Sequence, residues 1–392
     1  MGTKRRRTGK DVACSGFAAR MESHLTQLEA ESQLRDLRSS HSTSLCSNDY
    51  LGLAADPRLK AALLQAVENS SRTGATGSRL VSGHDPLWDA LEEQFAAFAG
   101  TQSALFFSSG FAANTGLLSA LLGPADLVFS DAFNHASIID GIRLSRAQKV
   151  IYPHLDLNAL EHALRRNRNR GGARVVVTES IFSMEGDRAP LLEIFELAGR
   201  YGAEVIVDEA HATGVCGPNG RGLVAELGLE PLAVIHTCGK ALASMGAFVC
   251  GSTTLRRFLI NRARSFIFST ALPPYCAGQI GAAVRLAWSM DKERSHLAAL
   301  SAALKNSLQE PGFSCGSSSS HIVPLVLGSN EDALSFSAAL EQRGFRVRAI
   351  RPPAVPTGTA RLRISLTAAL AMRDIHDFSD ALASISALAR HA

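Results

Sequence analysis

The sequence predicts an α/β fold with a large, doubly wound, mostly parallel sheet, followed by a smaller α+β unit. Short runs rich in β-branched and aromatic residues recur through the middle of the chain, at 104–107, 127–129, 149–152, 174–179, 203–210, 234–237 and 247–251. Helical segments of crossover length separate these runs, as in parallel sheets. The runs also lack hydrophobic alternation, which is typical of strands covered on both faces.

The first twenty residues are expected to form a disordered tail. Five basic side chains lie within MGTKRRRTGK, a charge run typical of a solvated terminus. The segment DVACSGFAARMESH that follows has no apolar core of the kind that a secretory signal requires. Residues 21–45 are expected to form a helix and a linker, because leucines recur at helix-compatible spacing from Leu25 to Leu37.

Residues 46–275 are expected to form the large α/β domain, with crossover helices at 89–100, 111–123, 157–168 and 191–202. After the Leu-Pro-Pro sequence at 272–274 the pattern changes, and residues 276–392 are expected to form the small α+β domain. An Ala-rich helical stretch to about residue 309 precedes the apolar run IVPLVLG, a helix near 331–343, short strands in VRAI and RLRISL, and a last helix.

Composition and charge favour small-molecule chemistry in the cytoplasm. The chain has 392 residues, of which 46% are hydrophobic, and a formal net charge of +4, too near neutrality to predict a nucleic-acid or membrane partner. No apolar stretch approaches the ~18–20 residues of a transmembrane helix. The seven cysteines are scattered without a CxxC pair, as in reduced cytosolic proteins, and no clustered ligands predict a metal site.

Ligands of open α/β sheets bind at the carboxyl ends of the strands, so the residues that follow each strand are the candidates for chemistry. SSGFAAN follows the strand ending at Phe107 and opens a helix. The N–H groups near Gly110 therefore suit a phosphate, although a tight turn without a ligand has the same pattern. SDAFNHASIIDG places His135 in a loop after another strand, where a surface position is the alternative.

Asp208 ends a buried strand in VIVDEAHATG, and His211 follows it. A carboxylate there requires a cation or several donors, unless it caps a helix. The segment contains Asp-Glu-Ala-His, which is found in nucleic-acid-dependent ATPases. Such an ATPase needs a GxxxxGK[ST] phosphate loop, and neither Gly-Lys pair, at 9–10 and 239–240, fits it. No GxGxxG follows an early strand, so a dinucleotide-binding fold is not predicted either.

Lys240 lies in VIHTCGKALASMGAFV, between two apolar strands and among small residues. Such a lysine has either a buried partner or a chemical role, because desolvation lowers the pKa of an amine and makes it a better nucleophile. Together the four segments meet the needs of pyridoxal 5′-phosphate, which requires an amine for its Schiff base, a carboxylate beside its pyridinium nitrogen and a helix N-terminus for its phosphate. Lys240, Asp208 and the Gly110 turn supply these, and His135 or His211 would contact the ring or its phenolic oxygen.

Several segments together resemble the α-oxoamine synthases, pyridoxal-phosphate enzymes of fold type I. The resemblance runs from about Met21 to the C-terminus. It is carried by SNDYLGLA (47–54), TGATGSRLVSG (73–83), FFSSGFAAN (106–114), FNHASIIDGIRLS (133–145), VVTESIFSMEGDRAPL (176–191), VDEAHATGVCGPNGRG (207–222), HTCGKALASMGAFV (236–249) and IFSTALPP (267–274). It implies an aspartate-aminotransferase-like fold and a homodimer.

The segment IRPPAVPTGTARLRISLTAA (350–369) is similar to the branch of this family that acts in biotin synthesis. That branch condenses L-alanine with a pimeloyl thioester, carried on coenzyme A or on an acyl-carrier protein. The resemblance makes Lys240 the Schiff-base lysine and Asp208 the pyridinium partner, and it makes His135, on the ring face, and His211 further catalytic residues. It implies cofactor contacts from Gly110, Phe111, Glu179, Ser183 and Thr237, and substrate contacts from Arg35, Asn48, His135, Ala354 and Arg361.

The chain also departs from the family pattern. Only SSHSTSLC (39–46) lies between the N-terminal helix and SNDYLG, where a longer segment is usual. Ala354 replaces a usual Thr, and Trp88 and Leu370 stand where His is expected. The alternative functions are a sister enzyme that uses glycine, such as a glycine C-acetyltransferase, and an inactive partner subunit. Lys240 argues against the second alternative, because an inactive subunit does not need the amine.

Overall fold

The computed structural model describes residues 16–37, 39–309 and 313–390, so residues 1–15 of the tail expected at 1–20 lie outside the described part, whereas residues 16–20 are helical. The first helix, α1 (Gly16–Ala30), begins before the expected start at Met21. It has no buried residue, so its leucines at helical spacing do not enter a core. Among the described residues, no helix is both long and apolar enough to span a bilayer.

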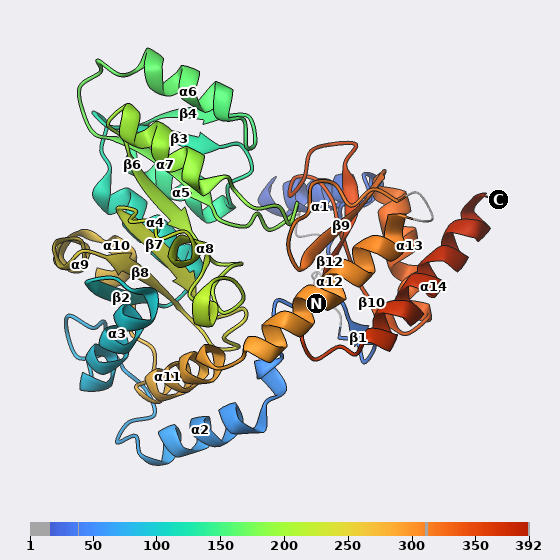
Figure 1. Cartoon of the computed structure of the whole chain (residues 1–392), viewed down its shortest axis with the longest axis horizontal. Coiled ribbons are helices and arrows are strands. Elements are labelled where there is room, and N and C mark those ends of the chain that lie inside the picture. Colours follow the sequence, from blue (N-terminus) through green and yellow to red (C-terminus); the bar gives the residue numbers. More distant parts are fainter. Residues whose placement is uncertain (1–15, 38, 310–312, 391–392) are drawn as a thin grey trace, which may run out of the picture.

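A seven-stranded sheet in the order β2-β8-β7-β6-β5-β3-β4 forms the centre of the fold (Figure 1). Its strands are β2 (Ser103–Phe107), β3 (Leu127–Asp131), β4 (Gln148–Tyr152), β5 (Arg174–Glu179), β6 (Glu204–Asp208), β7 (Ala233–Thr237) and β8 (Ala247–Gly251). β8 pairs antiparallel with β2 and β7, whereas the other neighbours pair in parallel. The predicted α/β fold with a mostly parallel sheet is confirmed.

Helices cover both faces of this sheet. One face packs against α4 (Gly110–Leu121), α5 (Ala136–Ser145), α9 (Thr253–Arg262) and α10 (Arg264–Ile267). The other packs against α3 (Pro86–Ala99), α6 (Leu157–Arg166), α7 (Leu191–Arg200), α8 (Leu223–Glu226) and α11 (Tyr275–Trp288). In β5, Val175 and Val177 enter the first core and Val176 enters the second. Because both faces are buried, the strands need no polar positions, which explains their unbroken apolar runs.

The C-terminal part forms a three-stranded antiparallel sheet in the order β11-β12-β9. It consists of β9 (Ile322–Gly328), β11 (Arg348–Ile350) and β12 (Ala360–Ser365), with α12 (Asp291–Gln309), α13 (Asn330–Gln342) and α14 (Met372–Arg390). The expected Ala-rich helical stretch is two helices, and the first, α11, packs against α2 (Pro57–Glu68) and α3 beside the large sheet. In Figure 1, α12 runs from there toward the C-terminal sheet.

The segment before residue 46 joins the C-terminal part of the fold. β1 (Thr43–Ser44) pairs in parallel with β10 (Phe345–Arg346), and Cys46 forms an isolated bridge with Ser365 of β12. The chain then enters the large unit through the short helix η1 (Leu53–Ala55) and α2; a second short helix, η2 (Pro218–Gly220), follows β6. The linker is therefore a structural part of the C-terminal unit, because it pairs with β10 and β12.

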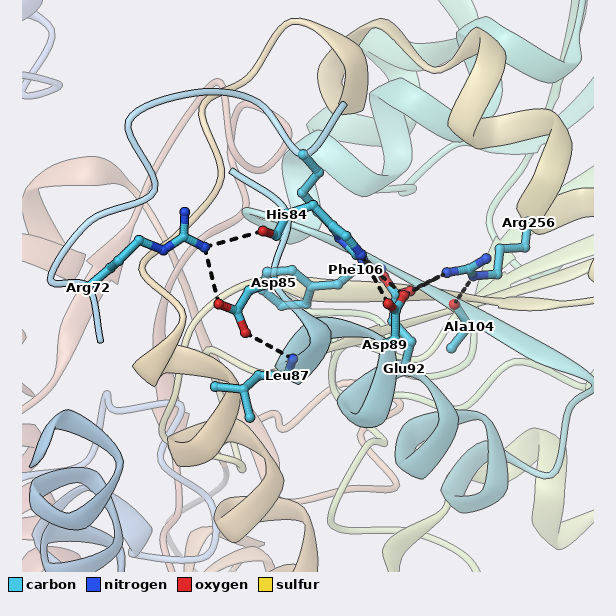
Figure 2. Close-up of polar contacts among 10 residues, drawn as sticks. Arg72, His84, Asp85, Leu87, Asp89, Glu92, Ala104, Phe106 and Arg256 are labelled. Atoms are coloured by element: carbon cyan, nitrogen blue, oxygen red, sulfur yellow. Dashed lines mark hydrogen bonds and ion pairs between the residues drawn. The ribbon is translucent and has the colours of Figure 1, made fainter. Parts of the chain in front are cut away.

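The loop that leads into α3 is fastened to the sheet by Glu92, a buried carboxylate of α3 (Figure 2). Glu92 accepts hydrogen bonds from Arg79 of the loop, from Arg256 Nη2 of α9 at 2.6 Å and from the backbone N–H of Phe106 in β2 at 2.9 Å. Two guanidinium groups and one N–H thus surround one carboxylate. We call this group of four residues the Glu92 anchor.

Candidate active site

A cavity of about 300 Å³ lies at the carboxyl ends of β5, β6 and β7, beside the N-terminus of α4. The four predicted strand-end segments all contribute to it. Of the residues named from the sequence, its lining includes Asn48, Gly110, Phe111, His135, Glu179, Asp208, His211, Thr237 and Lys240. The sequence reasoning missed Ser109, Asn114, Ser137, Ala210, Gly239 and Gly246, which also line it.

Lys240 lies in the turn between β7 and β8, where it lines the floor of this cavity among small residues. Its Nζ is 2.8 Å from His211 Nε2. Burial lowers the pKa of the amine to about 8, against the opposing effect of the Asp208 carboxylate. A larger fraction of this amine is therefore uncharged at neutral pH than for a lysine on the surface.

Asp208 is the last residue of β6 and is buried. Its Oδ2 accepts a hydrogen bond from Asn114 Nδ2 at 2.7 Å, and its Oδ1 accepts one from the backbone N–H of Ala210 at 2.8 Å. Asn114 also donates to Ser137 Oγ at 3.0 Å. Asn114 stands four residues after Gly110, one helical turn into α4, and that spacing within SSGFAAN was the available signal that it faces the site.

Glu179 ends β5 directly beside Asp208, its partner in the parallel register. Burial raises the pKa of Glu179 well above its usual range, and the negative charge of Asp208 raises it further. Burial beside Asp208 thus favours the protonated form of Glu179, whose Oε1 accepts the backbone N–H of His135 at 2.6 Å.

His135 caps the N-terminus of α5; it is exposed, as the surface alternative predicted, and it also lines the cavity. Its Nδ1 accepts the backbone N–H of Ser137 at 3.2 Å and lies 2.7 Å from Ser137 Oγ. Desolvation lowers the pKa of this imidazole. The ring is consequently neutral, and the cap holds it in one orientation.

His211 connects Lys240 to Tyr50, a residue from a distant part of the chain. Its Nδ1 lies 2.6 Å from the Tyr50 hydroxyl, while its Nε2 faces Lys240. Burial lowers the pKa of His211 well below its usual value, and the charge of Lys240 lowers it further. The Tyr50 hydroxyl donates to Asn48 Oδ1 at 3.0 Å, and Arg363 Nη1 donates to the same oxygen at 3.2 Å. These side chains form one continuous polar chain.

The first turn of α4 offers an anion cradle. The Ser109 hydroxyl accepts the N–H of Ala112 at 3.0 Å, and the Ser109 carbonyl accepts the N–H of Ala113 at 3.0 Å. Within the described residues, the N–H groups of Gly110 and Phe111 have no such partner. A Cβ on Gly110 would lie 2.8 Å from Thr237 Cγ2, so glycine keeps this turn open. Free N–H groups at a helix start, with the dipole's positive end, suit a phosphate.

The donor set fits pyridoxal 5′-phosphate. An amine with a lowered pKa, a buried carboxylate fixed by two donors, a neutral imidazole and an anion cradle line one cavity. Lys240 would hold the aldehyde and Asp208 the ring nitrogen. His135 would contact the ring face, and the start of α4 would hold the phosphate. No other cavity described below combines an amine, a carboxylate and a free helix start.

Four residues named from the sequence do not line this cavity: Arg35, Ser183, Ala354 and Arg361. Arg35 is exposed and donates to the carbonyl of Pro352 at 3.3 Å, so it lies beside the loop that carries Ala354. The Ser183 carbonyl accepts Nε of Arg363.

Arg361 and Arg363 stand two positions apart on β12 and therefore share one face of that strand. Arg361 Nη1 forms an ion pair with Glu185 at 3.0 Å, and Arg361 Nε donates to the Thr359 carbonyl at 3.0 Å. Arg363 instead bonds Asn48, a cavity residue, and its charge reaches both His211 and Lys240. Neither arginine lines the cavity; Arg363 contacts a lining residue, Asn48, whereas Arg361, the residue chosen from the sequence, pairs with Glu185.

The two positions where His is expected hold structural residues. Trp88 is fully buried and stacks on Phe106, with ring centroids 4.6 Å apart. Leu370 is buried, and its carbonyl lies 2.8 Å from His296 Nε2. Neither side chain lines the cavity, so these departures leave its chemistry unchanged.

The chain is similar to known proteins over most of its length. A family model described as aminotransferase class I and II matches residues 40–382. A curated 8-amino-7-oxononanoate synthase of Anaeromyxobacter dehalogenans is 48% identical over 344 residues, covering 87% of this chain and 86% of that protein.

Two solved structures are similar to this chain over most of its length. A serine palmitoyltransferase from S. paucimobilis with bound PLP and myriocin is 30% identical, with a TM-score of 0.86 and coverage of 96% of this chain and 100% of that one. An 8-amino-7-oxononanoate synthase from Francisella tularensis is 27% identical, with a TM-score of 0.77 and coverage of 89% and 99%.

Proposed function

The chain belongs to the aminotransferase class I and II family, and on this premise we propose that it is an 8-amino-7-oxononanoate synthase. The reaction joins L-alanine to a pimeloyl thioester and releases 8-amino-7-oxononanoate, carbon dioxide and the free thiol, a step of biotin synthesis. Identity of 48% over 87% of the chain to a curated enzyme of that name supports this function over those of more distant relatives.

One observation carries the proposal: the chain of contacts Tyr50–His211–Lys240 ends beside Asp208, in a cavity that opens on the start of α4. These residues fit pyridoxal 5′-phosphate. When bound, this cofactor supplies an electron-accepting ring next to the substrate carbon that loses its proton or carboxylate. The protein residues then have to bind, orient and move protons.

Lys240 and His211 handle protons in this scheme. The lowered pKa of Lys240 lets its Nζ accept a proton near neutral pH, and the neutral His211 Nε2 at 2.8 Å orients that amine. Asp208, held by Asn114 and the N–H of Ala210, presents a fixed negative charge to the cofactor's ring nitrogen. Burial and the charge of Asp208 favour the protonated form of Glu179, which opposes a second negative charge there.

Arg363 and Asn48 are the proposed site for the carboxylate of L-alanine. The Arg363 guanidinium is buried and lies on the polar chain that leads to Lys240. A guanidinium binds a carboxylate through two parallel N–H donors, which fixes its orientation. Arg361 remains the weaker proposal, because its ion pair with Glu185 would have to break. Arg35 and Ala354, which lie near each other, remain proposals for the acyl chain.

The test is an assay of the purified, cofactor-loaded protein with alanine, glycine and serine against acetyl, pimeloyl and palmitoyl thioesters. We expect alanine with pimeloyl thioester to have the highest kcat/KM, measured as free thiol and confirmed by the mass of the amino ketone. Coenzyme A and carrier-protein thioesters are compared in parallel. Preference for glycine with acetyl thioester would instead identify a glycine C-acetyltransferase.

A second candidate is serine palmitoyl transfer, because the TM-score to serine palmitoyltransferase, 0.86, exceeds the 0.77 to the solved synthase. The serine and palmitoyl arms of the assay test it. We further propose that the chain acts in the cytoplasm as a homodimer, as its resemblance to α-oxoamine synthases implies. Light scattering of the eluted protein tests the dimer.

A further inference from the structure

A second cavity, of about 420 Å³, lies along α12 and is larger than the candidate active site. Its polar lining is cationic. The lining contains the basic residues Arg188, Arg294 and Lys305, the hydroxyls of Ser301, Ser319 and Ser320, His321, Asn306 and Gln309, and no Asp or Glu. The proposed function uses none of these residues.

Two of the three basic residues retain unused donors. Arg294 is occupied, because it bonds Asp291 and the carbonyls of Gly214 and Ala287. Arg188 makes only long contacts, 4.0 Å to Glu226 Oε1 and 3.9 Å to Cys216 Sγ. Lys305 has no hydrogen bond or ion pair with any residue of the described chain, although it is only part exposed. Among the described residues, Lys305 has no acidic partner, and Arg188, which is exposed, has none closer than 4.0 Å.

His321 adds an unsatisfied polar atom to the same lining. It is 4% exposed, and its Nε2 has no partner within the described residues. A buried polar atom left without a partner costs free energy, and such atoms commonly mark a ligand or water that completes them. The charges that act on His321 are those of Arg363, Arg188, Lys305 and Lys240, all positive. The electrostatic field at this place favours a negative group.

His321 also links this cavity to the candidate active site. Its ring packs edge-on against Tyr50, with centroids 4.0 Å apart. Tyr50 contacts His211, which in turn contacts Lys240. A change at His321 therefore acts on a residue two contacts from the reactive amine.

We propose that this cavity binds a small anion bearing a phosphate or carboxylate group through Lys305 and Arg188, and that its occupancy changes the surroundings of Lys240 through His321 and Tyr50. Two cations with free N–H donors, together with the Ser319 hydroxyl, which accepts the backbone N–H of Arg188 and keeps its own proton, match the oxygens of such a group; the hydroxyls of Ser301 and Ser320 already donate to carbonyls. This inference goes beyond the proposed function and does not depend on which thioester the protein uses.

The binding test is calorimetric titration of the cofactor-loaded full chain with inorganic phosphate and, separately, with glutarate. Loading fills the cofactor's own phosphate site, so that site does not contribute. We expect one of the anions to bind and Lys305→Gln and Arg188→Gln each to weaken it at least tenfold. Lys292→Gln, which removes an exposed lysine from the same helix, should leave the affinity unchanged. The anion that binds identifies the phosphate or the carboxylate class.

The second readout is the visible absorption of the bound cofactor. Saturating anion should shift this band in the unmodified protein and in Lys292→Gln, but not in Lys305→Gln. The site would be overturned if neither anion bound. It would also be overturned if Lys305→Gln and Arg188→Gln bound the anion as tightly as the unmodified protein. Binding without any shift of the band would overturn the link to Lys240.

Discussion

Glu92 and Glu179 are equally buried glutamates, 3% and 2% exposed, in opposite electrostatic surroundings. Glu92 faces two guanidinium groups and one N–H (Figure 2). Glu179 faces the carboxylate of Asp208 and accepts the N–H of His135. The first is paired with cations, whereas the surroundings of the second favour its protonated form.

This difference separates an anchor from a reaction site. The cost of burying a charge is offset in the Glu92 anchor by matched partners, so the group fastens a loop to the sheet. At Glu179 and Asp208, like charges and burial shift pKa values, and these shifts surround Lys240 with groups of defined protonation. Burial of a carboxylate alone therefore does not identify a functional site; the sign of its neighbours does.

The largest effect is expected from the loss of the amine of Lys240 at the reaction site. Lys240→Ala should lower kcat by at least ~10⁴-fold, about 5 kcal/mol of transition-state stabilisation, because it removes the amine that binds the cofactor and moves the proton. The visible cofactor band should vanish, while the thermal midpoint of the protein without cofactor stays the same or rises. The exposed Lys60→Ala is the matched control. Normal turnover by Lys240→Ala would remove this residue from the mechanism.

The next effect belongs to the Glu92 anchor and concerns stability. Glu92→Gln should lower the free energy of unfolding by about 2 kcal/mol, because the buried guanidinium of Arg79 and the partly exposed one of Arg256 lose their close counter-charge and keep only the more distant Asp89. Denaturant unfolding measures the loss, and kcat per folded molecule should stay within about twofold. Glu93→Gln, at the exposed neighbouring position, is the control. A stable Glu92→Gln protein with lost turnover would assign Glu92 to the reaction instead.

A smaller effect distinguishes the two arginines of β12. Arg363→Lys should raise KM for alanine by roughly 10–30-fold, because an ammonium lacks the two-pronged geometry for a carboxylate. Arg361→Lys should change this KM by less than about threefold and act mainly through its ion pair with Glu185. Steady-state kinetics at saturating thioester provides both values. The reverse order would return the substrate carboxylate to Arg361.

The smallest effect is expected at Glu179. Glu179→Gln should change the unfolding free energy by less than about 1 kcal/mol near pH 5, because glutamine resembles the protonated acid. The folded pKa lies above the unfolded value of 4.5, so Glu179 contributes stability that is lost as pH rises above 4.5 toward its folded pKa. Between pH 5 and 7, the free energy of unfolding of cofactor-free Glu179→Gln should therefore rise relative to that of the unmodified protein. A wild-type-like pH slope in Glu179→Gln would show that Glu179 ionises normally.

The fold class and most of the site were predictable because the relevant patterns are local. Each strand is an apolar run, and Lys240, Asp208 and His135 directly follow strands, where parallel topology brings strand ends together. Asn114 was missed although its segment had been singled out, because only the packing of α4 shows which of its residues meets Asp208.

Arg363 shows the limit of a pattern within one strand. Arg361 and Arg363 point to the same face, so periodicity cannot rank them. Their neighbours rank them, Glu185 for the first and Asn48 for the second, and both neighbours come from distant segments. The same reason hid Glu92, whose arginines belong to the loop before α3 and to α9.

The sequence by itself determined the sheet, the strand-end chemistry and the family, because these depend on residue type and spacing along the chain. Only the tertiary structure decided that Tyr50 completes the contact to His211, that Arg363 contacts Asn48, and that Lys305 and His321 share a cavity. Those relations join residues far apart in the chain. Their energies depend on distance and burial, which spacing in a sequence does not specify.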